Sequence, residues 1–439
     1  MKDKQFKKFI PVWFGQFVSI LGSGLSSFGL SVWIFYSTGA ATPFALSFLC
    51  SMLPAVLFAP FAGSLADRRS RKAIVMITDS LDALLKIVMV LLLTADALQL
   101  WIVYVILFLS STFSTFQGPA FNASIPMMVG EKNIGRANGM LQFSQATQNM
   151  IAPILAGALY PFIGLRGLIG IDFVSFAVAI ITIAITTIPQ ERVAQEEGKK
   201  KSLLALAFGD SAEAFRFLIQ KSALFPYIIV FAVMNFIANI CMILIGPMVL
   251  GNYDSTIYGT VQTAYGVAML LGGIVSSVLP ERKNKAAAMF AVLTLSGIGL
   301  IVAGWSPYWG VIAAGMFLFF LMVPYANTLL QTILHTNVEK NMLGRVGALV
   351  NAMLKIVSPI ACIIAGPLAD EVFDPLMMAD GALGRGVLGA LFGTGAGRGS
   401  GVIFVICGIS LALLCIVMFI CACVRGQQEP SASNESMTA

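Results

Sequence analysis

Charged residues are scarce in this sequence: Asp, Glu, Lys and Arg make up 11% of its 439 residues, against about 25% in a soluble domain. It has one histidine, His335, which alone cannot build a metal site. The seven cysteines all lie in apolar runs without paired CxxC motifs, which excludes a disulfide framework. No HExxH, no catalytic triad and no GK[ST] phosphate loop is present, so a membrane-embedded enzyme is disfavoured.

Long apolar runs are what the sequence has instead. Hydrophobic residues make up 58% of the chain, and the mean hydropathy is +0.88. A bilayer core of about 30 Å requires about 20 apolar residues per helix, and backbone groups in lipid must bond internally. The pattern therefore predicts an all-α integral membrane protein with twelve transmembrane helices. The predicted spans are residues 10–36, 44–66, 73–95, 99–122, 139–163, 167–188, 223–250, 256–279, 286–305, 308–331, 345–369 and 401–424.

The basic residues fall on one side of these spans. If the N-terminus is cytoplasmic, 22 of the 27 Lys and Arg residues lie in cytoplasmic segments, 3 in external loops and 2 within spans. Cytoplasmic loops of membrane proteins carry this excess. We therefore expect a multi-pass protein of a plasma membrane with both termini in the cytoplasm. A basic face on an anionic leaflet also accounts for the net charge of +6, so no nucleic-acid partner is indicated.

A polar stretch near the middle divides the chain into two similar halves. The predicted organisation is a six-helix bundle over 1–189, a cytoplasmic linker with an amphipathic helix over 190–222, a second bundle over 223–425 and a tail over 426–439, which is expected to be disordered. The loop VGEKNIGRANGM recurs as VEKNMLGRVGAL, with Arg136 and Arg345 209 residues apart. Like loops on the same side indicate parallel repeats, which place a substrate site at their interface near the midplane.

The turn GSLADRRSRK carries a recognisable pattern, formed by Gly63, Asp67, Arg68, Arg71 and Lys72. This G-x-x-x-D-R-x-x-R-K turn resembles that of the major facilitator superfamily. WFGQFVSILGSGL, IPMMVGEKNIGRANG and IDFVSF are further similar to its macrolide-efflux-type exporters, which are bacterial. The resemblance implies two six-helix bundles and a turn that helps to close the cytoplasmic gate.

Within this turn, Gly63 is expected to let the second and third spans approach closely. The resemblance implies that Asp67 meets the positive N-terminal end of the eleventh span, near Gly344 and Arg345, and so clasps the two halves. The alternative is that the charges only set the topology and that Asp67 is solvated.

Charges inside the spans need a partner or a function, because a charge at mid-bilayer costs about 2.5–3.5 kcal/mol or more. Asp79, Asp82 and Lys86 lie three and four residues apart, on one face of the third span. They form either a proton relay or substrate contact, or an Asp82–Lys86 pair with Asp79 near the turn. Lys355 lies near the midplane and is a candidate counter-ion for a substrate or for Asp82. Asp172 either titrates during transport or caps a helix.

Uncharged polar residues in the spans are candidates for a cavity lining, although such groups also hold helices together. They are Gln16, Gln145, Asn149, Asn235, Asn239 and Gln331.

The sequence therefore favours a secondary transporter over an enzyme. No ATP-binding motif or cofactor site is evident, so a proton gradient is the expected energy source. The leading hypothesis is export of amphiphilic, macrolide-like drugs or metabolites by alternating access. The alternative is transport of a physiological solute such as a siderophore, sugar or lipid. The expected partners are the lipid bilayer, a small amphiphilic substrate and protons, and the protein is expected to act as a monomer.

Overall fold

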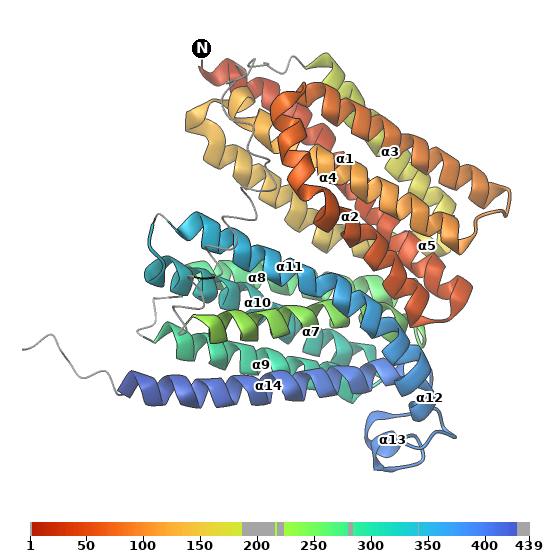
Figure 1. Cartoon of the computed structure of the whole chain (residues 1–439). Helices are drawn as coiled ribbons and strands as arrows, with labels where there is room; N and C mark the ends of the chain where they lie inside the picture. The colour runs from red at the N-terminus through yellow and green to blue at the C-terminus, as the bar shows by residue number, and fades with distance from the viewer. Residues whose placement is uncertain (1, 187–215, 217–223, 280–283, 341, 428–439) are drawn as a thin grey trace, which may run out of the picture.

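The computed structural model describes the chain except residues 1, 187–215, 217–223, 280–283, 341 and 428–439 (Figure 1). The first half consists of α1 (Lys2–Thr38), α2 (Ala41–Arg68), α3 (Arg71–Thr94), α4 (Leu100–Val129), a short 3₁₀ turn (Glu131–Asn133) and α5 (Ile134–Ile185). The helix α5 is interrupted at Gly164, where φ is 60° and ψ is −170°. Glycine accepts this conformation at little cost because it has no Cβ. The break divides α5 into two spans.

The second half consists of α7 (Phe225–Leu250), α8 (Ser255–Val278), α9 (Lys285–Trp305), α10 (Trp309–Asn337), α11 (Leu343–Pro367) and α14 (Arg398–Gln427). Between α11 and α14 the chain forms a π-helical turn (Leu368–Phe373), α12 (Asp374–Met377) and α13 (Val387–Phe392). This excursion projects from one end of the second bundle (Figure 1).

The prediction of twelve spans is confirmed. Ten helices of the described part are long and apolar enough to cross a membrane. The 24-residue α3 adds another, although its charges keep it out of that group, and the break at Gly164 makes two spans of α5. Exposed side chains in the middle of the spans, such as Leu84, Val174 and Leu413, give the bundle the apolar sides that a lipid bilayer requires. The predicted linker helix falls almost entirely outside the described residues, as does most of the tail.

Both α1 and α14 place the terminal ends of the chain on one face, which we call the terminal face; the opposite end is the distal face (Figure 1). At the distal face the two halves are in close contact along two seams. On the α2–α11 seam, a Cβ added to Gly366 would lie 2.6 Å from the Cα of Thr42. On the α5–α8 seam, a Cβ on Gly259 would lie 2.3 Å from the carbonyl oxygen of Pro153. Only glycine permits such backbone contact.

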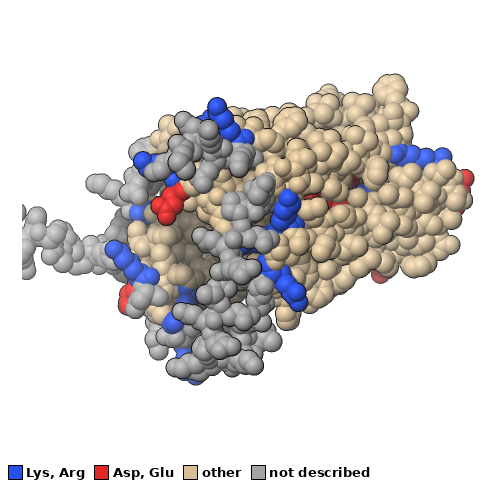
Figure 2. Space-filling model, turned by 90° about the horizontal axis from the view of Figure 1, so that it is seen from above, with Lys and Arg blue, Asp and Glu red and all other residues tan. Residues whose placement is uncertain are grey.

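Towards the terminal face the halves separate. The α5–α8 contact continues to Gly266, whose added Cβ would lie 2.6 Å from the Asn149 carbonyl oxygen. Gly273 lies seven residues further along α8, on the same helix face. An added Cβ there would meet no atom within 4 Å. A cleft therefore lies between the halves, closed at the distal face and open at the terminal face. Figure 2 shows Lys and Arg side chains mainly towards the terminal face.

Candidate functional site

Four charged side chains form a buried cluster inside the first half. Asp79, Asp82 and Lys86 of α3 are all buried, on one face of the helix, as their spacing predicts. The ammonium Nζ of Lys86 lies 2.8 Å from Oδ2 of Asp172, in the second part of α5, and 4.0 Å from Oδ2 of Asp82. The closest partner of Lys86 is therefore Asp172, and not Asp82 alone as one of the two sequence hypotheses assumed.

Hydroxyl groups from neighbouring helices bind these carboxylates. Ser23 and Ser26 of α1 donate to Asp172, at 3.1 and 2.5 Å, and Ser110 of α4 donates to Asp82. The interpretation of Asp172 as a helix cap is wrong: it lies two turns beyond the Gly164 break and is 0% exposed. The serines were missed because the sequence does not show which helix faces meet.

Asp79 lacks a cationic partner among the described residues. Its Oδ1 accepts a hydrogen bond from the amide of Gln117 on α4, while its Oδ2 is buried without any hydrogen bond in the described structure. The buried amide Nε2 of Gln16, on α1, is likewise without a partner there. Gln16 is 7% exposed, so it is buried inside the first half and does not line the cleft as predicted.

The charge balance of this cluster, defined as Asp79, Asp82, Lys86 and Asp172, determines its chemistry. The cluster holds three carboxylates and one ammonium group, which contacts Asp172 and Asp82, and all four side chains are buried. An uncompensated charge in a low-dielectric interior is costly, whereas a protonated carboxyl is neutral. The arrangement therefore favours proton binding by a carboxyl that Lys86 does not neutralise. Asp79 is the member that meets this description.

Lys355 lies in the cleft. It is exposed on α11, on the same face as Gly366, which lies three turns away and packs against α2. The neighbouring Asn351 is exposed as well. In the described part of the chain Lys355 makes no ion pair, and its expected partner Asp82 is buried within the first half. The hypothesis of an Asp82–Lys355 pair is therefore wrong for this conformation.

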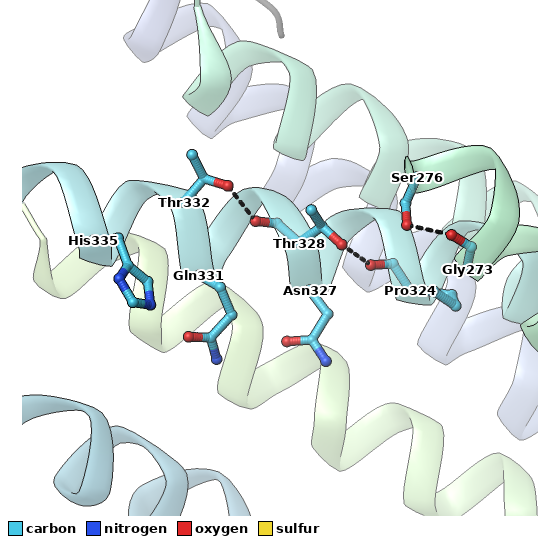
Figure 3. A pocket seen from close by; sticks show the side chains of 8 residues that line it. All are labelled: Gly273, Ser276, Pro324, Asn327, Thr328, Gln331, Thr332 and His335. Carbon is cyan, nitrogen blue, oxygen red and sulfur yellow. Dashed lines mark hydrogen bonds between the residues drawn. The ribbon is translucent and has the colours of Figure 1, made fainter. Parts of the chain in front are cut away.

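An open groove that carries several polar side chains runs between α8 and α10 and has a volume of about 640 Å³. Asn327, Gln331 and His335 lie one turn apart on α10 and point in the same direction (Figure 3). Nearer the distal face, the side of α8 that carries Gly273 packs against α5. The groove therefore opens into the cleft between the two halves. Gln331 was predicted to line a cavity, whereas His335 was excluded as a metal site; their four-residue spacing was the signal for a shared face. The groove is lined by Gly273, Ser276, Pro324, Asn327, Thr328, Gln331, Thr332 and His335.

The remaining predicted polar residues divide into two pairs. Gln145 and Asn149 are exposed on α5 at the level where the cleft opens, and Nε2 of Gln145 donates to Gln148 at 2.7 Å. Asn235 and Asn239 are half-buried on α7, and each amide donates to the carbonyl four residues earlier, at 2.9 and 2.7 Å. The α5 pair is thus available to a bound molecule, while the α7 pair is engaged with its own helix.

The turn between α2 and α3 acts within the first half. Arg71 donates to the carbonyl of Ala123, near the end of α4, at 2.7 Å. Lys72 donates to the carbonyls of Ala184 and Thr186, at the end of α5, at 3.1 and 2.9 Å. Cations at the C-terminal ends of helices satisfy free carbonyls and oppose the negative end of the helix dipole. These two residues therefore hold three helices of one half together.

The predicted roles of Gly63 and Asp67 require separate comment. A Cβ added to Gly63 would meet no atom within 4 Å, so the expected close approach at this glycine is wrong for this conformation. The side chains of Asp67 and Arg68 lie outside the described part of the structure. The clasp between Asp67 and α11 stays a prediction.

Arg136 and Arg345 occupy equivalent places. Arg136 is in the first turn of α5 and Arg345 in the first turn of α11, each the fifth span of its half. The guanidinium of Arg136 lies 4.5 Å from the centroid of the Phe6 ring, a cation–π contact. Equivalent positions on the same face agree with parallel repeats.

Comparison with known proteins gives the same family at the level of sequence. Residues 12–362 match the model of the Major Facilitator Superfamily. Macrolide efflux protein A of Streptococcus pyogenes is 26% identical over 376 residues, which cover 83% of this chain and 90% of that protein. The enterobactin exporter EntS of Citrobacter koseri is 23% identical over 353 residues, covering 79% of this chain and 81% of that protein.

Solved structures show the same fold. A bacterial homologue of the human lysosomal transporter Spinster, inward-facing and unoccupied, superposes with a TM-score of 0.70 at 15% identity, covering 99% of this chain and 100% of the other. An inward-facing bacterial homologue of ferroportin gives 0.68 at 14% identity, covering 95% and 98%. With two repeated six-helix halves, a cleft between them and a family match over most of its length, the chain belongs to the Major Facilitator Superfamily, a family of membrane transporters and not of enzymes.

Proposed function

We propose that this protein exports amphiphilic drugs or metabolites, including macrolide-like compounds, in exchange for protons. One observation carries the proposal: in a half that borders the cleft, three carboxylates are buried with a single ammonium, that of Lys86, which pairs with Asp172 and Asp82 and leaves Asp79 without a cation among the described residues. Because the ammonium does not neutralise all three carboxylates, one of them can gain and release a proton, which is what coupling to a proton gradient requires. The names of the efflux-type relatives support the direction of transport.

The orientation follows from charge. Basic residues dominate the terminal face, and by the positive-inside rule we propose that this face lies in the cytoplasm of a bacterial plasma membrane. The cleft is then open to the cytoplasm and closed to the outside, the state in which an exporter takes up its substrate. Alternation with an outward-open state, by rocking of the two halves, would release the substrate outside. We propose that one chain performs this cycle as a monomer.

The substrate would bind in the cleft through a mixture of contacts. Gln145 and Gln331 supply hydrogen-bonding amides from opposite halves. Lys355 supplies a cation near the membrane midplane, without a protein counter-ion in the described structure. These groups suit an amphiphile with several polar atoms on an apolar framework.

A second candidate function is export of an acidic metabolite such as a siderophore. Lys355 favours it, because it is exposed without an ion-pair partner among the described residues, and a cation at this depth is stabilised by an anionic group. The similarity to a protein named as an enterobactin exporter agrees with it. Macrolide-like compounds and acidic metabolites would be distinguished by the charge of the molecules that the protein moves.

Export is tested in a host that lacks its major drug pumps. We expect expression of the protein to raise resistance to at least one amphiphilic drug and an uncoupler to abolish the effect. Purified protein in liposomes should show proton flux that depends on the same compound. The absence of both resistance and substrate-dependent proton flux across a broad panel of neutral, cationic and acidic amphiphiles would overturn the proposal.

Replacement of Lys355 tests the substrate contact. We expect Lys355→Leu to lower export of acidic compounds at least about tenfold, the effect of losing about 1.4 kcal/mol of binding. Because the side chain is exposed and makes no ion pair within the described structure, expression and thermal stability should not fall. Lys355→Arg should keep most activity, and Lys340→Leu, at an exposed position on the terminal face, should keep all of it. Normal export by Lys355→Leu would show that Lys355 does not contact the substrate.

A further inference from the structure

The first turn of α2 is capped by a residue of the other half. The N-cap position, Ala40, has no side chain that could accept a hydrogen bond from the helix. The carboxylate of Asp370 does so instead: Oδ1 accepts from the Ala41 N–H at 2.8 Å and Oδ2 from the Thr42 N–H at 2.7 Å. Free N–H groups at a helix start need such partners, and a negative charge there is favoured by the helix dipole.

This arrangement differs from the other capped helices. Ser70 caps α3, Asp254 caps α8 and Asn284 caps α9, each through an N–H three residues further along the same chain segment. As the second span of its half, α8 is the counterpart of α2, and its Asp254 accepts from Ile257 at 2.9 Å. Loss of that bond would affect one half only. The bonds of Asp370, in contrast, join the two halves.

The surrounding contacts place Asp370 at the distal gate. It lies in the π-helical turn that follows α11, one turn beyond Gly366. Gly366 packs against the backbone of Thr42, so the end of α11 and the start of α2 are in direct contact. In the outward-open state of alternating access the two halves separate at this face. Both hydrogen bonds of Asp370 must then break.

We infer that Asp370 is a positioning residue of the transport cycle, whose carboxylate latches the distal gate shut by capping α2 across the two halves. The latch favours the conformation in which the cleft opens only at the terminal face. The inference rests on the alternating access proposed above, but it concerns the balance between conformations and does not depend on the substrate or the coupling ion.

The test measures the distal gate directly. Spin labels are attached at Ala97→Cys and Ala382→Cys, exposed distal positions in the two halves, after replacement of the native cysteines. Distance distributions are recorded by pulsed electron paramagnetic resonance in nanodiscs, without substrate or pH gradient. We expect Asp370→Asn to raise the ratio of long to short distances about tenfold, equivalent to about 1.4 kcal/mol. An amide carries no net charge and can offer only one acceptor oxygen to the two N–H groups.

Asp374→Asn is the matched control. Asp374 lies four residues further on the same face, and its Oδ1 accepts from the Gly399 N–H at 2.8 Å, a cap of α14 within the second half. We expect this variant to leave the distances between the halves unchanged. If both variants changed the distances between the halves equally, the effect of Asp370→Asn would reflect local loosening of the segment after α11. That result would overturn the inference.

A second variant guards against misfolding. Ala40→Ser in the Asp370→Asn background supplies α2 with a cap from its own sequence: residue 40 already has the extended backbone of an N-cap, and the serine hydroxyl can accept from the Thr42 N–H, since Pro43 at the next position has none. This double variant should regain thermal stability yet keep the shifted distances. A folded Asp370→Asn or double variant with wild-type distances would overturn the inference. A shifted gate in a protein that exports nothing would leave the latch standing and reject the proposed function.

Discussion

Asp172→Asn is expected to lower the free energy of unfolding by about 3–5 kcal/mol, the usual cost of removing one partner of a buried ion pair. The carboxylate of Asp172 is 2.8 Å from the Lys86 ammonium, and its side chain is 0% exposed. An asparagine would keep hydrogen bonds with Ser23 and Ser26 but would leave the ammonium with Asp82, at 4.0 Å, as its remaining carboxylate. Denaturant titration of purified protein in detergent, followed by intrinsic fluorescence, measures the loss.

An exposed pair in the same half provides the control. Arg166 and Asp96 are 3.2 Å apart, with side chains 52% and 90% exposed. Solvent-exposed pairs contribute about 0–1 kcal/mol, so Asp96→Asn should change stability little. Asp96 has a φ of 51°, a conformation that asparagine also tolerates, so this substitution adds no backbone strain.

The double variant Lys86→Met with Asp172→Asn isolates the ion pair. Removal of both charges leaves no ammonium without its closest carboxylate, but it also takes the cation from Asp82, so only part of the lost stability should return. It should not restore proton-driven export, because the cluster would then lack both its cation and one carboxyl. If Asp172→Asn proved as mild as Asp96→Asn, the short contact between Lys86 and Asp172 would not be a structural element of the first half.

The predicted spans agree closely with the helices because apolar length is a local property. The predicted span 256–279 corresponds to α8 at Ser255–Val278, and 286–305 to α9 at Lys285–Trp305. The break between the fifth and sixth spans was expected near Gly164, although the helix resumes there without a loop. The π-helical turn and α13 were not predicted, since the glycine-rich segment that contains them has no clear periodicity.

The site was predicted only where one helix determines it. Asp79, Asp82 and Lys86 share a face because of their spacing on α3, and this face is buried. The partner Asp172 comes from another helix, and the sequence does not specify how two helices are rotated against each other. Gly63 shows a further limit. Contacts between moving halves depend on the conformational state, which a motif does not reveal.

Asp370 shows the same limit: its partners cannot be identified from the residues next to it in the sequence. It follows α11 in an acidic Asp–Glu pair that resembles an ordinary solvated turn. Its role depends on the start of α2, 328 and 329 residues earlier in the chain, where Ala40 leaves the helix uncapped. A missing cap in the sequence was therefore the available signal, and only the fold shows which residue supplies it.

Asp79→Asn is expected to abolish export driven by a pH gradient, lowering the initial rate at least about a hundredfold, which corresponds to about 2.7 kcal/mol. Among the described residues, the groups that face this carboxyl are Gln16 from α1, Asp82 from α3 and Gln117 from α4. None of them is a cation, and Lys86 is engaged by Asp172. Asp79 is therefore the cluster member that alternates between protonated and charged forms in the proposed cycle, and asparagine cannot do so.

The same substitution should leave folding intact. The asparagine Oδ1 can still accept the hydrogen bond from Gln117, and a buried negative charge is removed, so the melting temperature should stay equal or rise. This outcome separates Asp79→Asn from Asp172→Asn, in which both stability and export fall. Asp380→Asn, at a carboxylate 98% exposed on the distal side, should change neither property.

The decisive measurement uses liposomes with the protein and a pH-sensitive dye inside. For Asp79→Asn we expect no substrate-dependent proton flux, while exchange of labelled for unlabelled substrate without a pH gradient continues near the wild-type rate. Continued exchange would show that the cleft still binds and moves the substrate, so that only the coupling is lost. Wild-type proton flux in Asp79→Asn would assign the titrating group to another carboxyl of the cluster, and Asp82→Asn would then be the next variant to measure.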